Sequence, residues 1–491
     1  MTREKKKTAV ILCAAGALVA TAMILDRSPA EGRTAANTPT QPKTTEPSPT
    51  PPMTAKCDNN APSRTSADFA RGKLGAGLSA GKILRATGGQ VYAAFDLTTL
   101  PDGSTERPPL NVAVVIDRSG SMEGTPFDQA KDAALRFIDQ LSDRDRMALV
   151  QYDDTAQVVV ASTSLDREGR DRLRRAVRAM TVGGSTNLHG GMALGRDEVQ
   201  RTFQAGQVSR VILMSDGKAN TGVTDSGEIA DAARGAAEHG VRITSVGIGL
   251  DYNEDLMETI AEAGRGNYYY VKDTSTLDGV LAGELRSIQG TVATAVELKL
   301  ATACDGVEIA EVVGYESRKD GTATIVPMAD LTGNDSRKVL VALRVPDRSN
   351  GRIGALTAEI SYKDAKSGDI VKAKVALALE VTDDHAAVQS SIDKDVMAQV
   401  LKAQAATSMR AAAQAYEKGD KNGALQILQA TETKMEAEAG RYGVSAAAMA
   451  PAMGSVRGMA DDAKAYDPGE AGGKDLLKKS KSRARDMSKG K

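Results

Sequence analysis

The chain has 491 residues, and 41% of them are apolar, which is enough for about two to four domains with their own cores. Its 63 Lys and Arg are balanced by 64 Asp and Glu, so the formal charge of −1 provides no overall positive field, and we expect no nucleic-acid partner. Aromatic residues make up only 3% and Trp is absent, which argues against sugar-stacking and base-stacking surfaces.

Cysteine and histidine are too few and too scattered to form a zinc site, a disulfide framework or a thiol active site. The chain has three of each: Cys13, Cys57 and Cys304, and His189, His239 and His385. No His-Glu-x-x-His motif occurs, and no Cys–His spacing points to a thiol protease. Any metal chemistry must therefore use oxygen ligands.

Residues 1–26 are expected to act as an export signal. Met1–Lys7 is mostly basic, and Thr8–Leu25 then runs for 18 residues without a charge. This run is just long enough to cross a membrane as a helix, but Ala20-Thr21-Ala22 also fits a signal-peptidase site, so an anchor and a cleaved signal peptide are both open. By the positive-inside rule, the chain after Asp26 faces outward. We therefore expect a secreted protein, or one anchored in the membrane and facing the periplasm or the cell surface.

Residues 27–63 are predicted to form a proline-rich linker. They contain eight of the sixteen prolines of the chain. Proline fixes φ and removes a backbone donor, so this segment favours an extended tether that holds the next domain away from the membrane. In an oxidising compartment, Cys57 and Cys304 either pair or stay as two free thiols.

Between residues 110 and 288, short apolar runs alternate with segments of helical spacing. Phe127–Leu141 repeats apolar residues every three or four positions, and Thr274–Ile288 is the last such segment. The expected strands are Leu110–Ile116, Met147–Tyr152, Arg210–Met214, Val241–Ile248 and Asn267–Val271. This alternation predicts an α/β, Rossmann-like fold with a doubly wound, mainly parallel sheet covered by helices on both faces. Ligands of such folds bind beyond the carboxyl ends of the strands.

Three loops of this segment carry hydroxyl and carboxylate side chains. The first strand runs into Asp117-Arg118-Ser119-Gly120-Ser121, a later loop reads Gly183-Gly184-Ser185-Thr186, and Ser215-Asp216-Gly217 follows another strand. At Asp117, Ser119, Ser121, Thr186 and Asp216 the chain resembles a von Willebrand factor type A domain, whose metal-ion-dependent adhesion site is written Asp-x-Ser-x-Ser, then Thr, then Asp. All five positions match, and the resemblance covers about Leu110–Leu285.

The resemblance implies that these five residues hold a metal ion with one open position, which takes an Asp or Glu of a protein partner. Hydroxyl and carboxylate oxygens in this number suit Mg²⁺ or Mn²⁺ better than a carboxylate-rich Ca²⁺ cage. A competing interpretation assigns the Ser and Thr residues to helix caps and Asp216-Gly217 to a turn. The complete set of five, in the right order, favours the metal site.

Residues beside the motif are candidates for supporting roles. Arg118 and His189 either touch a bound ligand or form a solvated rim, and Asn187 and Asn220 are candidates for bonding the ligand loops from outside. Gly120, Gly183 and Gly184 are expected where the loops need positive φ or a close approach.

On both sides of the α/β segment the sequence alternates with the period of a strand. Gln90–Leu97 lies before it, in a strand region over residues 64–109. Six runs follow within residues 289–384: Val292–Leu300, Val307–Val313, Thr322–Val326, Lys338–Val345, Ala355–Tyr362 and Val371–Val381. We expect an antiparallel β-sandwich into which the α/β domain is inserted, with connections near Leu100–Pro109 and Ser287–Gly290.

The last hundred residues divide into two predicted parts. Residues 385–445 are predicted to form a short helical hairpin resembling one tetratricopeptide unit, and a single unit is expected to cap the sandwich. Residues 446–491 are predicted to be a disordered basic tail, because Pro468–Lys491 has eight Lys and Arg against three acidic residues. The whole arrangement resembles bacterial exported von Willebrand type A proteins often described as chloride-channel-like. Since the leader is the one stretch apolar enough to span a membrane, we do not expect a channel.

These inferences lead to one preferred hypothesis and two alternatives. In the preferred hypothesis, the chain is a non-enzymatic adhesion or assembly protein of the cell envelope that binds an acidic group of a protein partner through Mg²⁺ or Mn²⁺. Its N-terminal segment would contact the membrane, and we expect no small-molecule substrate. In the first alternative, the protein is an envelope scaffold in which the metal only stabilises the fold. The second is a metal-dependent hydrolase, which is disfavoured because Ser119 stands where an aspartyl phosphatase needs a second acid and no phosphate-binding Gly-Lys-Ser/Thr loop occurs.

Overall fold

The structure is a computed structural model, and it describes residues 58–85, 89–101, 107–216, 218–302, 306–347 and 349–490. The predicted export signal, most of the proline-rich linker, Cys57 and Cys304 lie outside the described residues. Within the described ranges, no helix is both long and apolar enough to cross a membrane.

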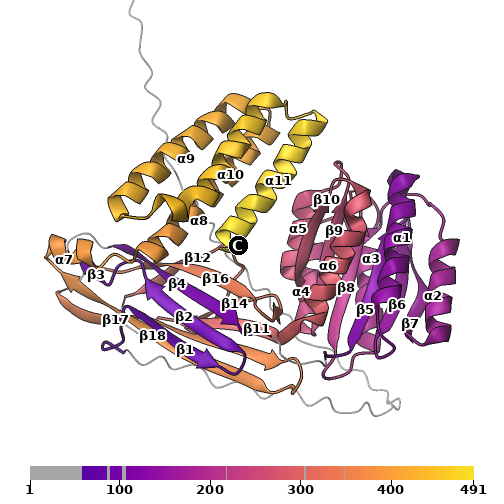
Figure 1. Ribbon diagram of the computed structural model, residues 1–491, viewed down its shortest axis with the longest axis horizontal. Helices are drawn as coiled ribbons and strands as arrows, with labels where there is room; N and C mark the ends of the chain where they lie inside the picture. The colour runs from indigo at the N-terminus through magenta and orange to yellow at the C-terminus, as the bar shows by residue number, and fades with distance from the viewer. Residues whose placement is uncertain are drawn as a thin grey trace, which may run out of the picture. The chain divides into compact units, whose positions relative to one another are not determined.

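The α/β segment contains a six-stranded sheet in the order β10-β9-β8-β5-β6-β7 (Figure 1). Its strands are β5 (Leu110–Asp117), β6 (Arg146–Tyr152), β7 (Ala156–Ser164), β8 (Val208–Ser215), β9 (Val241–Ile248) and β10 (Arg265–Val271). All neighbours are parallel except β7, which is antiparallel to β6. Every residue of β5, β8 and β9 is buried, as expected for central strands covered on both faces.

Helices cover both faces of this sheet, and two separate cores lie beneath them. One core contains side chains of α1 (Thr125–Gln140), α2 (Arg167–Ala179) and α6 (Leu277–Gln289). The other contains side chains of α3 (Leu188–Arg201), α4 (Ser226–Glu238) and α5 (Glu254–Ala263). Two 3-10 turns, η2 (Gly120–Met122) and η3 (Thr274–Thr276), complete the segment. The predicted doubly wound, mainly parallel α/β fold is confirmed.

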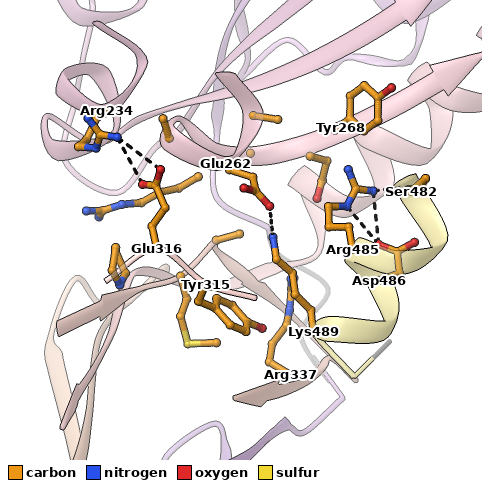
Figure 2. A pocket seen from close by; sticks show the side chains of 18 of the residues that line it. Arg234, Glu262, Tyr268, Tyr315, Glu316, Arg337, Ser482, Arg485, Asp486 and Lys489 are labelled. Carbon is orange, nitrogen blue, oxygen red and sulfur yellow. Dashed lines mark hydrogen bonds and ion pairs between the residues drawn. The ribbon is translucent and has the colours of Figure 1, made fainter. Parts of the chain in front are cut away.

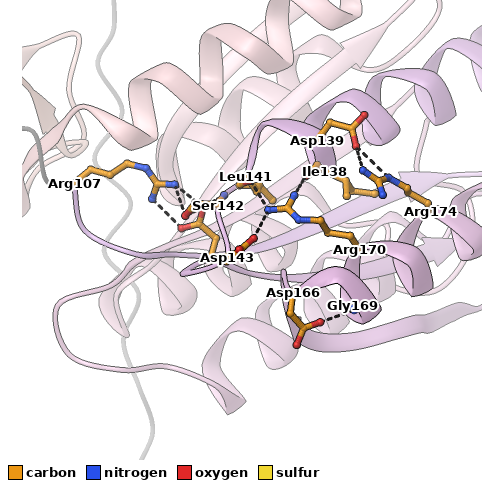
Figure 3. A network of polar contacts seen from close by, with 11 residues as sticks. Arg107, Ile138, Asp139, Leu141, Ser142, Asp143, Asp166, Gly169, Arg170 and Arg174 are labelled. Atoms are coloured by element: carbon orange, nitrogen blue, oxygen red, sulfur yellow. Dashed lines mark hydrogen bonds and ion pairs between the residues drawn. The ribbon is translucent and has the colours of Figure 1, made fainter.

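A polar network connects the incoming chain to the amino-terminal ends of β5 and β6, on the side of the sheet opposite the ligand loops (Figure 3). Arg107, in the connection from β4 (Gln90–Thr99), pairs at 2.6 Å with Asp145, which also accepts a hydrogen bond from the backbone amide of Leu110. Arg170 of α2 donates to the carbonyls of Ile138 and Leu141, which satisfies acceptors that the end of α1 leaves free. The network fixes where the chain enters the α/β domain.

The remaining strands form two sheets that pack into a sandwich around one apolar core. One sheet has the order β1-β2-β4-β16-β12, and the other has the order β13-β14-β11-β17-β18-β3, with β15 paired to β11. The bounds of β4 are given above, and those of the other strands are β1 (Arg64–Phe69), β2 (Gly72–Leu78), β3 (Lys82–Leu84), β11 (Thr291–Ala301), β12 (Glu308–Val313), β13 (Arg318–Asp320), β14 (Ala323–Pro327), β15 (Leu331–Thr332), β16 (Ser336–Arg344), β17 (Gly351–Asp364) and β18 (Ile370–Thr382). Neighbours are antiparallel except β3 and β18. The chain leaves the sandwich after β4 and returns at β11.

Helices occupy the rest of the chain, and here one prediction was wrong. The bounds are α7 (His385–Ser390), α8 (Lys394–Glu417), α9 (Lys421–Tyr442), α10 (Ala446–Ala465) and α11 (Ala471–Ser488). We expected a hairpin ending at residue 445 and disorder from 446 to 491, but α10 and α11 pack with α8 and α9 around a common core. The basic composition hid apolar contacts at Leu476, Leu477 and Met487. Glu254 of α5 pairs with Lys478 and Lys481 of α11, and Glu262 of α5 pairs with Lys489 just beyond the end of α11.

Candidate metal centre

The five predicted ligands lie on three loops, and two of these loops leave the carboxyl ends of neighbouring strands. Asp117 is the last residue of β5, and Asp216 directly follows β8, which pairs with β5 in the sheet. The parallel register places Ile116 opposite Met214, so both loops begin at the same edge. Asp117 is fully buried, and Ser119 and Thr186 are nearly so, with 2% and 3% of their surfaces exposed.

A chain of short contacts joins four of the five residues. One carboxylate oxygen of Asp117 accepts from the backbone amide of Ser119 at 2.9 Å. The hydroxyls of Ser119 and Ser121 lie 3.2 Å apart. The Ser121 hydroxyl then donates to Asp216 at 2.8 Å. Because Ser121 is exposed while Asp117 is buried, the centre opens toward solvent on the Ser121 side.

Backbone hydrogen bonds bring the loop of Thr186 to the same place. The amide of Gly120 donates to the carbonyl of Gly184 at 2.8 Å, and the amide of Gly183 donates to the carbonyl of Arg118 at 2.6 Å. Thr186 is held from its other side by Asn220, whose side-chain oxygen accepts from the Thr186 amide at 2.8 Å. The structure thus brings all three ligand loops together.

The glycines of the second loop are explained by close approach and not by positive φ. A Cβ on Gly183 would lie 2.1 Å from a carboxylate oxygen of Asp153, and one on Gly184 would lie 2.1 Å from a carboxylate oxygen of Asp154. A Cβ on Gly120 would meet nothing closer than 3.7 Å. None of the three glycines has positive φ. The loop after β6, which carries Asp153 and Asp154, therefore forms a further wall of the centre.

The electrostatics of the two carboxylates favour a cation. Burial raises the pKa of Asp117, although hydrogen bonds from Ser119 and Ser215 oppose the shift. Burial also raises the pKa of Asp216 to about 6, with the Ser121 hydroxyl opposing the shift and the Asp117 carboxylate adding to it. No Lys or Arg of the described ranges forms an ion pair with either carboxylate. Two carboxyl groups that burial disfavours as anions, with only hydroxyl and amide donors around them, fit a divalent cation of the Mg²⁺ class.

The donor set depends on hydroxyls as much as on carboxylates. Elsewhere in the described ranges, and at this centre, no group of three or more His, Cys, Asp and Glu side chains is placed to hold a metal ion. The residues that would hold a cation here are two carboxylates and three hydroxyls: Asp117, Asp216, Ser119, Ser121 and Thr186.

The residues proposed as neighbours have different roles. Arg118 pairs with Asp153 at 2.5 Å and donates to the Thr181 carbonyl, so it braces two loops. His189 lies in the first turn of α3, where burial lowers its pKa, and it forms no hydrogen bond with any described residue. Asn187 caps α3 by accepting from the Gly190 amide. Of the two asparagines, only Asn220 bonds directly to a ligand residue.

Two buried residues support Asp117 and were missed by sequence reasoning. The Ser215 hydroxyl donates to the second carboxylate oxygen of Asp117 at 2.7 Å. Tyr152, the last residue of β6, is fully buried and donates to the Met214 carbonyl at 3.0 Å. Both are strand-end residues on neighbours of β5, and this was the one signal in the sequence that pointed to them.

Comparisons with known proteins agree with this geometry. A family model described as the von Willebrand factor type A domain matches residues 111–282. The protein sll0103 of Synechocystis is 26% identical over 339 residues, which cover 67% of this chain and 79% of that protein. YfbK of Escherichia coli is 31% identical over 220 residues, which cover 44% of this chain but only 38% of that protein.

A solved structure shares most of the fold. A von Willebrand factor type A protein from Catenulispora acidiphila aligns with a TM-score of 0.67 over 87% of this chain and 99% of that chain. At 19% identity, this likeness shows the fold and nothing more. It extends well beyond residues 111–282, so the α/β domain is similar together with parts of the chain outside it.

Proposed function

Residues 111–282 form a von Willebrand factor type A domain, and from this we propose that its metal centre binds an acidic side chain of a protein partner through Mg²⁺ or Mn²⁺. Domains of this family often mediate interactions between proteins. The observation that carries the proposal is the pair of carboxylates, Asp117 and Asp216, linked through serine hydroxyls at the carboxyl ends of β5 and β8. Among the residues that the structure describes, no Lys or Arg pairs with either carboxylate.

Each ligand residue has a distinct part in this proposal. Asp117 is held at both oxygens by Ser119 and Ser215, so it keeps a fixed position for a cation. Ser121 is exposed, which leaves an approach for a partner. When bound, the cation would supply a Lewis acid that accepts a carboxylate oxygen of an incoming Asp or Glu.

The test is metal-dependent capture of partners by the full chain. Asp117→Ala, and Ser119→Ala combined with Ser121→Ala, should abolish Mg²⁺ binding in calorimetric titrations and should abolish capture of proteins from envelope extracts. EDTA should do the same to the unmodified chain. The matched control is Asp128→Asn, an exposed carboxylate in the first turn of α1, which should bind as the unmodified chain does.

The outcomes separate this proposal from its alternatives. Undiminished capture by Asp117→Ala would contradict it. If Mg²⁺ raises the melting temperature but capture survives EDTA, the metal is structural and the protein is a scaffold. Mg²⁺-dependent turnover of phosphate esters would instead support a hydrolase, although Ser119 occupies the position of the second acid that an aspartyl phosphatase needs.

We propose a location outside the cytoplasm for this binding. The support is the sequence of residues 1–26, a basic start followed by 18 uncharged residues, and the proline-rich linker after it. Protease added to intact cells or spheroplasts should cleave the chain. Protection of the whole chain until the inner membrane is lysed would contradict this location.

A further inference from the structure

A second site candidate lies away from the metal centre, in a pocket of about 960 Å³ lined by three parts of the chain (Figure 2). The α/β domain contributes residues of α4, α5 and β10, the sandwich contributes the connection from β12 to β13, and α11 closes a third side. This volume is at the upper end of the range for small-molecule sites, which is about 300–1,000 Å³.

The lining of this pocket is strongly basic. Its acidic residues are Glu238, Glu262, Glu316 and Asp486, and its basic residues are Arg234, Arg265, Arg318, Arg337, Lys479, Arg483, Arg485 and Lys489. Eight positive against four negative groups leave an excess of four, whereas the whole chain has a formal charge of −1. Four of the basic residues also pair with carboxylates outside this lining, so the excess that remains for an anion is smaller: the pairs are Arg318 with Glu297, Arg337 with Asp335, Lys479 with Asp475 and Arg485 with Glu258.

Some of these cations are already neutralised, and two are not. Figure 2 shows Lys489 paired with Glu262, at 2.6 Å, and Arg234 paired with Glu316, at 3.4 Å. Arg265 and Arg483 form no ion pair with any residue in the described part of the chain. These two guanidinium groups are available to a ligand.

The backbone at Arg265 is strained. Its φ is +53°, a left-handed conformation that is costly for a residue with a long side chain. The next residue must be glycine, because a Cβ on Gly266 would lie 2.1 Å from the carbonyl oxygen of Ile243. Burial and the nearby Arg242 lower the pKa of Arg265, and this outweighs the opposing effect of the carboxylates of Glu297 and Glu238. Strain of this kind is concentrated at functional sites.

A tyrosine adds an unsatisfied donor to the same pocket. The Tyr315 hydroxyl is buried and has no hydrogen-bond partner among the described residues, which is an unfavourable arrangement unless a ligand supplies an acceptor. Lys489 lies 5.5 Å from the centre of the Tyr315 ring, and Arg485 lies 5.0 Å from that of Tyr268. The pocket thus combines free cations, a free hydroxyl and aromatic faces.

We propose that this pocket binds a small organic molecule that carries two or more oxyanion groups, with Arg265, Arg483 and the Tyr315 hydroxyl as its polar contacts. Guanidinium groups and a hydroxyl all donate to carboxylate or phosphate oxygens. A bare inorganic ion would fill only a small part of the volume, so the ligand has a body that packs on Tyr268, Met328 and Ala329. Because three parts of the chain surround it, the ligand would hold them together.

The test uses the full chain, freed of divalent cations on a chelating resin and then titrated with pyrophosphate, citrate and adenosine diphosphate. Working without divalent cations keeps the metal centre out of the experiment. At least one of the three should bind saturably with a dissociation constant below a few millimolar, and Arg265→Gly combined with Arg483→Ala should weaken it at least tenfold. If phosphate chemistry is preferred, pyrophosphate and adenosine diphosphate will bind and citrate will not. If the organic body matters, adenosine diphosphate will bind more tightly than pyrophosphate.

The choice of variants separates binding from folding. Glycine accepts φ of +53° without strain, so Arg265→Gly should melt at the same temperature as the unmodified chain or higher. The control variant is Arg172→Gln, which removes the charge of an exposed arginine on α2 and should bind the probes as the unmodified chain does. Asp117→Ala should also bind normally, since the metal centre takes no part. Equal affinity in the Arg265→Gly, Arg483→Ala variant, or no saturable binding of any probe, would overturn the proposal.

Discussion

The ammonium group of Lys478, on α11, lies 2.7 Å from the carboxylate of Glu254, at the start of α5, and 3.7 Å from the centre of the Tyr252 ring. The side chains of Lys478 and Glu254 are 3% and 12% exposed, so the pair is nearly removed from water. Further contacts follow along the two helices, from Lys481 to Glu254 at 2.8 Å and from Lys489 to Glu262 at 2.6 Å. The C-terminal helix and the residue after it are therefore docked on the α/β domain by pairs of opposite charge.

Glu254→Gln should loosen this docking more than Lys478→Met. The glutamine leaves a buried ammonium without its counter-charge, at a cost of about 3 kcal/mol. The methionine keeps the packing on Tyr252, and Glu254 retains Lys481, so we expect a loss below about 1.5 kcal/mol. Hydrogen exchange of residues 471–488 would measure this. Equal protection of α11 in the two variants would contradict the prediction.

Ser215→Ala should weaken the metal centre without touching a ligand. It removes the hydroxyl that holds the second oxygen of Asp117, and loss of such a supporting contact lowers metal affinity about 10-fold to 100-fold. Calorimetric titration with Mg²⁺ is the measurement. Ser209→Ala is a control on the same strand, because its buried hydroxyl has no hydrogen-bond partner among the described residues. If both variants bind Mg²⁺ alike, Ser215 does not position Asp117.

Gly183→Ala should destabilise the ligand loops. The new Cβ would collide with the carboxylate of Asp153 and displace it from Arg118, with an expected loss of about 1–3 kcal/mol. Gly120→Ala is the matched control, because its Cβ would meet nothing closer than 3.7 Å. Thermal unfolding should show a lower midpoint for the first variant alone. A midpoint for Gly183→Ala equal to that of Gly120→Ala would show that the loop moves freely to accept the methyl group.

Asp364→Asn should lower stability near neutral pH and much less in acid. Burial alone would raise the pKa of Asp364, but hydrogen bonds from Arg71 and from the amides of Ser367 and Lys366 outweigh it and lower the pKa to about 2. A carboxyl whose pKa is lower in the folded state stabilises the fold above its unfolded pKa of about 3.9, and this stabilisation is lost as the pH falls toward 2.

The unfolded and folded pKa values of Asp364 set the pH range over which its contribution to stability changes. The difference between pKa values of about 3.9 and about 2 corresponds to about 2–3 kcal/mol at pH 7, and about half of it should remain at pH 3. Chemical unfolding at both pH values would measure it. Asp369→Asn, an exposed residue of the same turn, serves as the control. A loss for Asp364→Asn that is the same at pH 7 and pH 3 would show that charge is not the cause.

The α/β fold and its ligand loops were predictable because their signals are local. Runs such as Leu110–Ile116 are apolar throughout, and both neighbours of β5 in the sheet are parallel to it, so loops that follow such strands meet at one edge. Asp117, Ser119 and Ser121 stand on one of these loops at alternate positions. The strand β7 was missed, because Ala156–Ser164 is only partly buried and its serines and threonine interrupt the apolar pattern.

The sequence by itself determined the alternation of strands and helices, the order of the five oxygen ligands and their place at strand ends, since all of these depend on spacing along the chain. Only the tertiary structure decided what meets across long separations. Lys478 is 224 residues from Glu254, and Arg242 is 88 residues from Asp330, its partner at 2.9 Å. A run of lysines has the same composition whether water or an acidic helix neutralises it, so only folding distinguishes a disordered tail from the docked helix α11.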